Sequence, residues 1–330
     1  MVRAGQKIGS QGRAVDRAGA NVPVVPNEFD DQRVDVGQVD DRRGGGGRLP
    51  GGGLAIGGGA GVVGVIIYVV VTLLGGNPAQ LQLPTTAGSG AQAGGGSAAG
   101  AETSDQLRTR CNSDGAIDKY TDCRLIKAFN VADTTWKAEF DRRGQAYRSP
   151  KFGLFTGATQ TGCGQASAEV GPFYCPPDEE IYFDVGFLGQ LQKQLGFGGG
   201  FAFDYVVAHE FGHHLQTLLG TEPKVRQAQQ RNPSQGNKYS VALELQADCY
   251  AGGWANLADA STSNGVHLSS ADISGALDAA AKVGDDYIQK KMQGQVNPES
   301  FTHGTSAQRD QWFTTGYKSG DITACNTFSG

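Results

Sequence analysis

Three residues near the middle of the chain have the types and spacing needed to bind zinc and activate water. His209, Glu210 and His213 form the motif H-E-x-x-H within residues 203–219, whose apolar spacing predicts a helix. Residues four apart share a helix face, so both imidazoles can contact one metal ion while Glu210 lies beside its water. His214 points elsewhere around the helix and is assigned a packing role. The motif predicts a zinc hydrolase.

Such a site needs a third protein ligand and leaves its fourth position to water. Residues 240–260 predict a second helix, in which Glu244 and Asp248 share one face. We expect Glu244 to be the third ligand and Asp248 to accept the spare N–H of a ligand imidazole, with His209 as the first candidate. The alternative is a solvated acidic face, which predicts that zinc is retained after Glu244→Ala.

These residues resemble the gluzincin metallopeptidases, in which a helix with H-E-x-x-H is followed by a helix with E-x-x-x-D. Three longer segments are similar to the bacterial membrane-anchored neutral zinc metallopeptidase family: A-H-E-F-G-H-H-L-Q, E-L-Q-A-D-C-Y-A-G-x-W-A and F-T-H-G-T-S-A-Q-R. The similarity extends to R-V-D-V-G-Q-V-D-D-R-R-G, G-P-F-Y-C-P and V-G-D-D, over roughly residues 28–330. It implies a zincin core with an edge strand that aligns the substrate beside the zinc helix, a place that residues 181–184 could fill.

The chemistry expected of this site is peptide-bond hydrolysis. Zinc would bring the pKa of its bound water near neutrality, and Glu210 would take the water's proton and pass it to the leaving amine. The developing oxyanion needs a further donor, for which His303 is the candidate and Arg309 and Tyr182 are the competitors. His303 could equally be a loop imidazole bonded to the backbone.

The first hundred residues predict a membrane anchor. Residues 49–101 contain no charged side chain, and residues 54–74 form an apolar, glycine-rich run about long enough to span a bilayer. We therefore expect one transmembrane helix within residues 49–74; the alternative is a buried core helix. Arg42, Arg43 and Arg48 precede the run, which predicts a single-pass protein of the bacterial cytoplasmic membrane with its N-terminus inside and its domain outside the cytoplasm.

The rest of the chain divides into a tail, a linker and one domain. Residues 1–48 are rich in charge, Gly and Pro, and we expect a disordered cytoplasmic tail. Residues 75–104 have the composition of a flexible linker, and residues 105–330 are long enough for one zinc metallopeptidase domain. The net charge of −5 is mild and spread along the chain, and gives no indication of nucleic-acid binding.

All six cysteines follow the apolar run, which indicates disulfides formed in an oxidising compartment. Proximity in sequence favours two short bridges and leaves a third pair for a long one: Cys111 with Cys123, Cys163 with Cys175, and Cys249 with Cys325. The competing interpretation makes Cys249 a metal ligand, although two His, one Glu and water already satisfy zinc.

The expected fold is α+β, a zincin-like domain that is mainly helical with a small sheet. Helices are predicted at residues 118–143, 203–219, 240–260, 269–292 and 305–319, and strands at residues 151–155 and 180–184.

Together these features predict a membrane-anchored, zinc-dependent endopeptidase with one Zn²⁺ per chain. Its expected partners are peptide or envelope-protein substrates and, through residues 54–74, the lipid bilayer. Two alternatives stay open: a non-catalytic envelope scaffold with a structural zinc, and a zinc hydrolase of a non-peptide amide. A structural site would have no use for Glu210, which binds no metal.

Overall fold

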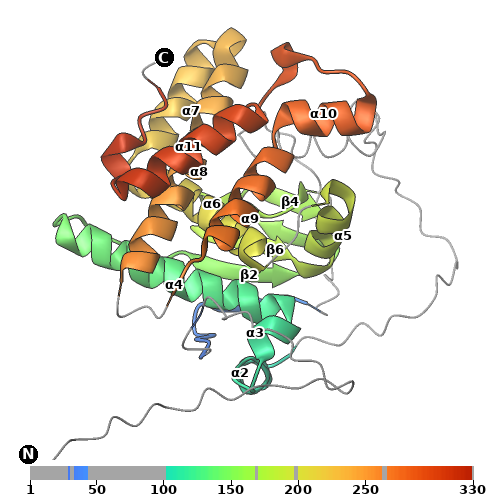
Figure 1. Ribbon diagram of the computed structural model, residues 1–330, viewed down its shortest axis with the longest axis vertical. Coiled ribbons are helices and arrows are strands. Elements are labelled where there is room, and N and C mark those ends of the chain that lie inside the picture. The colour runs from blue at the N-terminus through green and yellow to red at the C-terminus, as the bar shows by residue number, and fades with distance from the viewer. Residues whose placement is uncertain are drawn as a thin grey trace, which may run out of the picture.

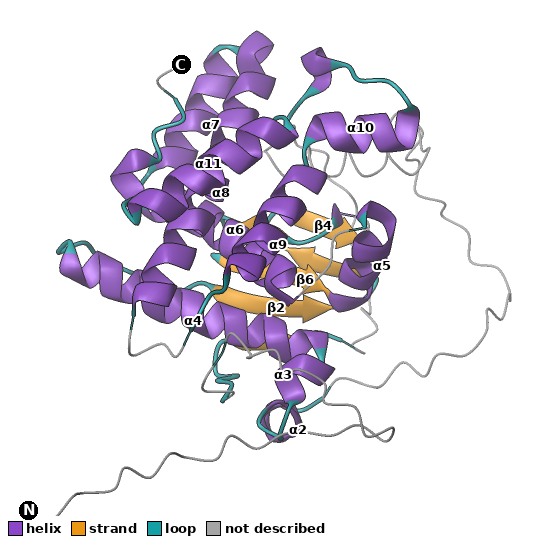
Figure 2. Cartoon of the chain, viewed as in Figure 1, coloured by secondary structure: helices purple, strands orange, loops and turns teal. Residues whose placement is uncertain are grey.

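The computed structural model describes Phe29 and residues 33–43, 102–167, 170–196, 200–261 and 266–328. Most of this part is helical, with one four-stranded sheet and a separate two-stranded one (Figure 2). The predicted α+β class, mainly helical with a small sheet, is confirmed. Among the described residues, no helix has the length and apolar character needed to cross a bilayer. The predicted membrane segment, residues 49–74, lies outside them.

The four-stranded sheet has the order β1-β2-β6-β5. Strands β1 (Val39–Asp41), β2 (Lys151–Phe155) and β6 (Glu180–Asp184) run parallel, and β5 (Phe173–Cys175) pairs antiparallel with β6. The expectation that residues 181–184 form the edge strand is therefore wrong. The disulfide-linked segment before β6 supplies a further strand, and β5 takes the edge while β6 lies inside the sheet.

Helices are present at all five predicted positions. In chain order the helices are α2 (Ser104–Cys111), α3 (Ala116–Lys119), α4 (Thr121–Arg142), α5 (Val185–Leu195), α6 (Gly200–Leu218), α7 (Thr221–Arg231), α8 (Gly236–Ala260), α9 (Ser270–Lys282), α10 (Asp285–Gln293) and α11 (Ser306–Ser319). Of these, α2, α5 and α7 are helices that the sequence analysis did not predict. Strands β3 (Ala158–Thr161) and β4 (Gly164–Ser167) form an antiparallel hairpin.

The single helix predicted over residues 269–292 is two helices, α9 and α10. Gly284 between them is extended, with φ −66° and ψ 141°. A Cβ at this position would lie 2.5 Å from the backbone nitrogen of Ser306, so α11 begins directly against it. The break lets the chain change direction where the apolar periodicity alone suggests continuity.

Glycines allow the helices around the metal-binding motif to pack closely. A Cβ on Gly212 of α6 would lie 2.7 Å from the Cα of Ala247 in α8. Likewise, a Cβ on Gly316 of α11 would lie 1.8 Å from the carbonyl oxygen of Cys249 in α8. Figure 1 shows α8 and α11 side by side as a result. The Gly212 contact sets the short distance between α6 and α8, from which the site is built, and the Gly316 contact sets the distance between α8 and α11.

All three predicted disulfides are present: Cys111–Cys123, Cys163–Cys175 and Cys249–Cys325. The first joins α2 to α4, and the second links the β3–β4 turn to β5. The third joins α8 to the C-terminal segment. Because Cys249 is bonded to Cys325, the structure rules out the interpretation of Cys249 as a metal ligand.

Part of the predicted tail is folded against the domain. Val34 and Val36 are buried between exposed neighbours, and β1 follows them to pair with β2. Phe29 is also buried and forms an isolated bridge with Val266. Disorder, predicted for residues 1–48, is thus wrong for residues 33–43. Val34 and Val36 alternate with exposed residues, as in a β-strand. This pattern is short and lies among charged and glycine-rich residues, so the sequence analysis did not recognise it.

Candidate metal centre

The structure brings together the three residues predicted as metal ligands. His209 and His213 lie one turn apart on α6, and Glu244 faces them from α8. One potential ligand atom from each residue lies within 4.8 Å of the other two. Nε2 of His209 is 3.1 Å from Oε2 of Glu244, and Nε2 of His213 is 3.5 Å from Oε1. Two imidazole nitrogens and a carboxylate oxygen are the donor set of many hydrolytic zinc sites.

Both imidazoles are oriented through the ring nitrogen that faces away from Glu244. Nδ1 of His209 lies 2.9 Å from Oδ1 of Asp248, as the sequence predicted for one of the two rings. Nδ1 of His213 lies 2.9 Å from Oε1 of Gln216. Oxygen acceptors at Nδ1 place the proton there and leave Nε2 free to bind a metal. Gln216 was missed by the sequence analysis, although its spacing of three from His213 would have indicated it.

Behind His209, Asp248 is held in a buried network with Arg309 and Tyr205. Oδ1 of Asp248 accepts hydrogen bonds from the Tyr205 hydroxyl (2.6 Å) and from Nη2 of Arg309 (3.0 Å). Nε of Arg309 forms an ion pair with Oδ2 at 2.9 Å. Burial alone would raise the pKa of Asp248, but Arg309 and His209 bring it below its ordinary value. Asp248 therefore faces His209 as a carboxylate.

The two competing oxyanion donors, Arg309 and Tyr182, are both engaged by buried carboxylates. Arg309 is buried behind His209 and bonded to Asp248. Tyr182 is buried in the interior strand β6, where its hydroxyl donates to Asp178 or Glu180, and it lines a separate hollow with Arg42. None of the three candidates, His303 included, lines the pocket beside His213. The choice of His303 as the donor therefore stays a prediction.

His303 lies in a loop held by one carboxylate at the start of α10. Oδ2 of Asp285 accepts the backbone N–H groups of Thr302, His303 and Gly304, at 2.7, 2.6 and 3.0 Å. Its Oδ1 lies 3.1 Å from Nδ1 of His303. Burial lowers the pKa of the His303 ring, but Asp285 and Glu244 raise it above its ordinary value. A protonated His303 presents a donor at Nε2 as well. The sequence analysis noted V-G-D-D only as part of the family resemblance and assigned Asp285 no role.

Glu210, predicted as the general base, lies close to the candidate metal ligands. It lines a pocket that also includes His213 and Glu244, and its Oε2 is buried without a hydrogen-bond partner within the described structure. Burial raises the pKa of Glu210 above its ordinary value, and the two imidazoles only partly offset this. The backbone of Tyr174 in β5 also hydrogen-bonds to the carboxylate. Oε2 of Glu210 can therefore accept a proton from a molecule bound in the pocket.

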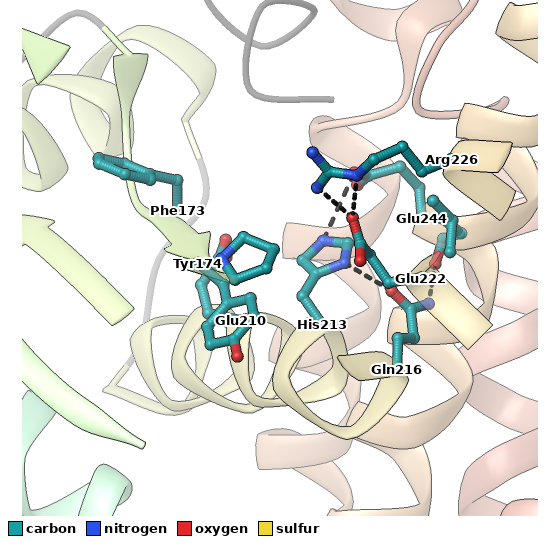
Figure 3. Close-up of a pocket in the computed structure, with 10 residues that line it drawn as sticks. Phe173, Tyr174, Glu210, His213, Gln216, Glu222, Arg226 and Glu244 are labelled. Carbon is teal, nitrogen blue, oxygen red and sulfur yellow. Dashed lines mark hydrogen bonds and ion pairs between the residues drawn. The ribbon is translucent and has the colours of Figure 1, made fainter. Parts of the chain in front are cut away.

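The pocket lies between β5 and the helices, as Figure 3 shows. Phe173 and Tyr174 face it from the β5 side, and an ion pair between Glu222 and Arg226 lies at the other side, on α7. Leu243 and Pro176 complete the apolar lining.

His214 connects α6 to the edge strand β5. Its Nδ1 lies 3.1 Å from the Tyr174 hydroxyl, and its Nε2 lies 2.7 Å from the carbonyl oxygen of Arg148. The packing role predicted for His214 therefore includes fixing β5 against α6.

Comparisons with known proteins identify one family and several similar proteins. A protein family described as "Putative neutral zinc metallopeptidase" matches residues 30–328. "Uncharacterized protein YpfJ" of Escherichia coli (strain K12) is 46% identical over 233 residues, which cover 69% of this chain and 78% of that protein. "Uncharacterized protein Rv2575" of Mycobacterium tuberculosis (strain ATCC 25618 / H37Rv) is 46% identical over 228 residues, which cover 67% and 75%. No solved structure matches the chain.

Proposed function

The chain belongs to this family of zinc metallopeptidases, and we propose that it is a zinc-dependent endopeptidase that cleaves peptides or envelope proteins outside the cytoplasm. One observation supports the catalytic part most strongly. The unpartnered, buried Oε2 of Glu210 lies in the same pocket as His213 and Glu244, two of the three clustered ligand residues. A purely structural metal site has no need for such a carboxylate.

Zinc would be held by His209, His213 and Glu244. When bound, it would acidify a water molecule and polarise the scissile carbonyl group. Glu210 takes a proton from the attacking water and returns it to the leaving amine. Burial raises its pKa, which makes Glu210 a stronger base toward the attacking water than an ordinary carboxylate.

His303 stabilises the negative charge that develops on the carbonyl oxygen. Asp285 orients the ring through Nδ1 and favours its protonated form, so Nε2 is the donor available to the substrate. The substrate carbonyl would lie between His303 and the three ligands. The backbone N–H contacts to Asp285 keep the loop in place before substrate binds, so little reorganisation is needed.

Strand β5 suits the binding of an extended peptide. It forms one edge of the sheet and contributes Phe173 and Tyr174 to the pocket beside Glu210. An added substrate strand would pair with backbone groups at this edge other than those of Tyr174 that bond to Glu210. The apolar lining from Phe173, Pro176 and Leu243 would accept a nonpolar side chain of that peptide.

The disulfides support the proposed location outside the cytoplasm. Three disulfides bridge the described cysteines, and disulfides persist mainly in oxidising compartments. The apolar residues 54–74 are proposed to attach the protein to the bacterial cytoplasmic membrane.

The direct test of peptide hydrolysis is product analysis with the full-length protein in detergent. We expect cleavage of unfolded protein substrates to stop after zinc is chelated and to return with added zinc, and each product pair to include a new amino terminus. Release of an amine from a non-peptide amide, with no new peptide terminus, would instead support a different zinc hydrolase.

A further inference from the structure

The segment R-V-D-V-G-Q-V-D-D-R-R, residues 33–43, takes no part in the proposed chemistry. It nevertheless makes specific contacts with the domain formed by residues 102–328. We propose that this segment is a docking element of the domain, and that both therefore lie on the same side of any membrane to which the protein is attached. This inference does not depend on catalytic activity.

Two asparagines of the domain recognise the backbone of the segment. Asn112 accepts the N–H of Val34 at 2.9 Å and donates to its carbonyl oxygen at 3.0 Å. Asn130 does the same for Asp35, at 2.8 and 3.0 Å. A side-chain amide that satisfies both backbone groups of one residue mimics a neighbouring strand. These two pairs fix the register of the segment before β1 begins.

The side chains of the segment fit buried partners on the domain. Val34 and Val36 enter the core, while Arg42 reaches Glu180, whose side chain is only 3% exposed. Arg42 also lies over the ring of Tyr182, 5.0 Å from its centroid. Without the segment, the domain would expose apolar surface and leave the buried Glu180 without this cation. The domain is therefore incomplete without residues 33–43.

The chain leaves the domain and returns to it at one cluster of charges. Arg43, the last described residue before the apolar run, pairs with Asp122 at 2.6 Å and with Glu102 at 3.5 Å. Glu102 is the first described residue after the run, and it also pairs with Arg110 at 2.5 Å. Both ends of residues 44–101 are thus held at the same place on the domain.

A single crossing of the bilayer between residues 43 and 102 would separate the segment from its binding surface. The contacts therefore place residues 33–43 and residues 102–328 on one side of the membrane in this proposal. This differs from the orientation expected from the basic residues before the apolar run, which places the tail inside and the domain outside. Contact of residues 54–74 with lipid is compatible with the proposal if it begins and ends on one face.

The first test measures on which side each part lies. Asp35 and Lys137 are both exposed, one in the segment and one on α4. Single variants Asp35→Cys and Lys137→Cys of the full-length protein are labelled in spheroplasts with a membrane-impermeant maleimide, and each signal is divided by the signal after lysis. We expect equal ratios for the two positions. Labelling of only one position in spheroplasts would overturn the proposal.

If both positions react only after lysis, the same-side inference holds but the proposed location outside the cytoplasm fails. The two ideas are thus tested separately.

The second test asks whether the segment is docked in the membrane-bound protein. The double variant Asp35→Cys/Thr134→Cys is treated with a short bismaleimide, and the linked peptides are identified by mass spectrometry. We expect efficient linkage, because the exposed Thr134 lies one helical turn after Asn130, whose side chain bonds to Asp35 and is left intact. The matched control, Asp35→Cys/Lys238→Cys, places the second thiol at an exposed position on α8 and should give at least tenfold less. Equal linkage in both, or none in either although both thiols react with a monofunctional maleimide, would overturn the docking.

Discussion

Oδ1 of Asp248 lies 2.9 Å from Nδ1 of His209, while Nε2 of the same ring faces Glu244. The orientation of this metal ligand is therefore controlled by a carboxylate that does not itself reach the metal position. Arg309 and Tyr205 hold that carboxylate in place. The arrangement connects α11, the last long helix of the described chain, to the ligand on α6.

Asp248→Asn should weaken zinc binding without removing a ligand. The amide is uncharged and no longer raises the basicity of His209, and such changes typically reduce metal affinity by about 10–100-fold. Zinc affinity would be measured by competition with a chromophoric chelator. Asp278→Asn, at an exposed carboxylate on α9, is the control and should leave zinc affinity unchanged. Equal affinity in both variants would exclude a role for Asp248 at the metal site.

Glu244→Ala should abolish stoichiometric zinc binding, because it removes one of three protein ligands and leaves two imidazoles. Zinc content after dialysis would be measured by elemental analysis, with circular dichroism to show that the fold persists. Glu299→Ala, at an exposed position, should retain one zinc per chain. Retention of zinc by Glu244→Ala would restore the interpretation of this residue as part of an acidic surface.

Asp285→Asn should change the pH dependence of cleavage. Asp285 and Glu244 raise the pKa of His303 against burial, so the ring stays protonated above its ordinary value of about 6.5 and loses its proton as pH rises through the raised pKa. Without the Asp285 charge this pKa falls, so we expect the alkaline limb of the kcat/KM profile to move to lower pH. The variant should be closest to the wild type at acid pH.

His303→Ala supplies the control for this shift. Removal of one oxyanion donor typically lowers kcat by about 100- to 1000-fold, and the limb assigned to His303 should disappear. An unchanged alkaline limb in both variants would show that His303 does not donate to the reacting carbonyl.

The long disulfide should stabilise the fold more than the short one at the β3–β4 hairpin. Cys249–Cys325 closes a separation of 76 residues, and Cys163–Cys175 closes 12. By loop entropy these correspond to about 4.5 and about 3 kcal/mol of unfolding free energy. Double Cys→Ser variants compared by chemical denaturation should show this order. A larger loss at the short bridge would mean that local packing, rather than loop closure, sets the stability.

The parts of the site that lie within single helices could be predicted from sequence. The spacing of four in His209 and His213, and again in Glu244 and Asp248, defines a shared face on each helix whatever the rest of the fold does. The sequence analysis had to assume only that α6 and α8 turn these faces toward each other. Gly212 makes that approach possible, but its partner Ala247 cannot be identified without the tertiary structure.

Contacts between segments far apart in the sequence could not be predicted in the same way. The N–H groups that Asp285 collects belong to a loop whose position depends on the break at Gly284, and no local pattern predicts it. The choice of edge strand failed for a similar reason. Strand order depends on which segment pairs with β6, and three residues of β5 carry too short a pattern to reveal this.

Glu210→Gln tests the central claim most directly. The amide keeps the size of the side chain and cannot take a proton from water, while the three zinc ligands stay unchanged. We expect full zinc content, an unchanged melting temperature and a loss of about 100- to 10,000-fold in kcat for peptide cleavage. Cleavage by Glu210→Gln at the wild-type rate, with zinc bound, would contradict the proposed mechanism. Zinc binding without cleavage by either protein, across a broad peptide library, would contradict the peptidase assignment and favour a structural zinc site.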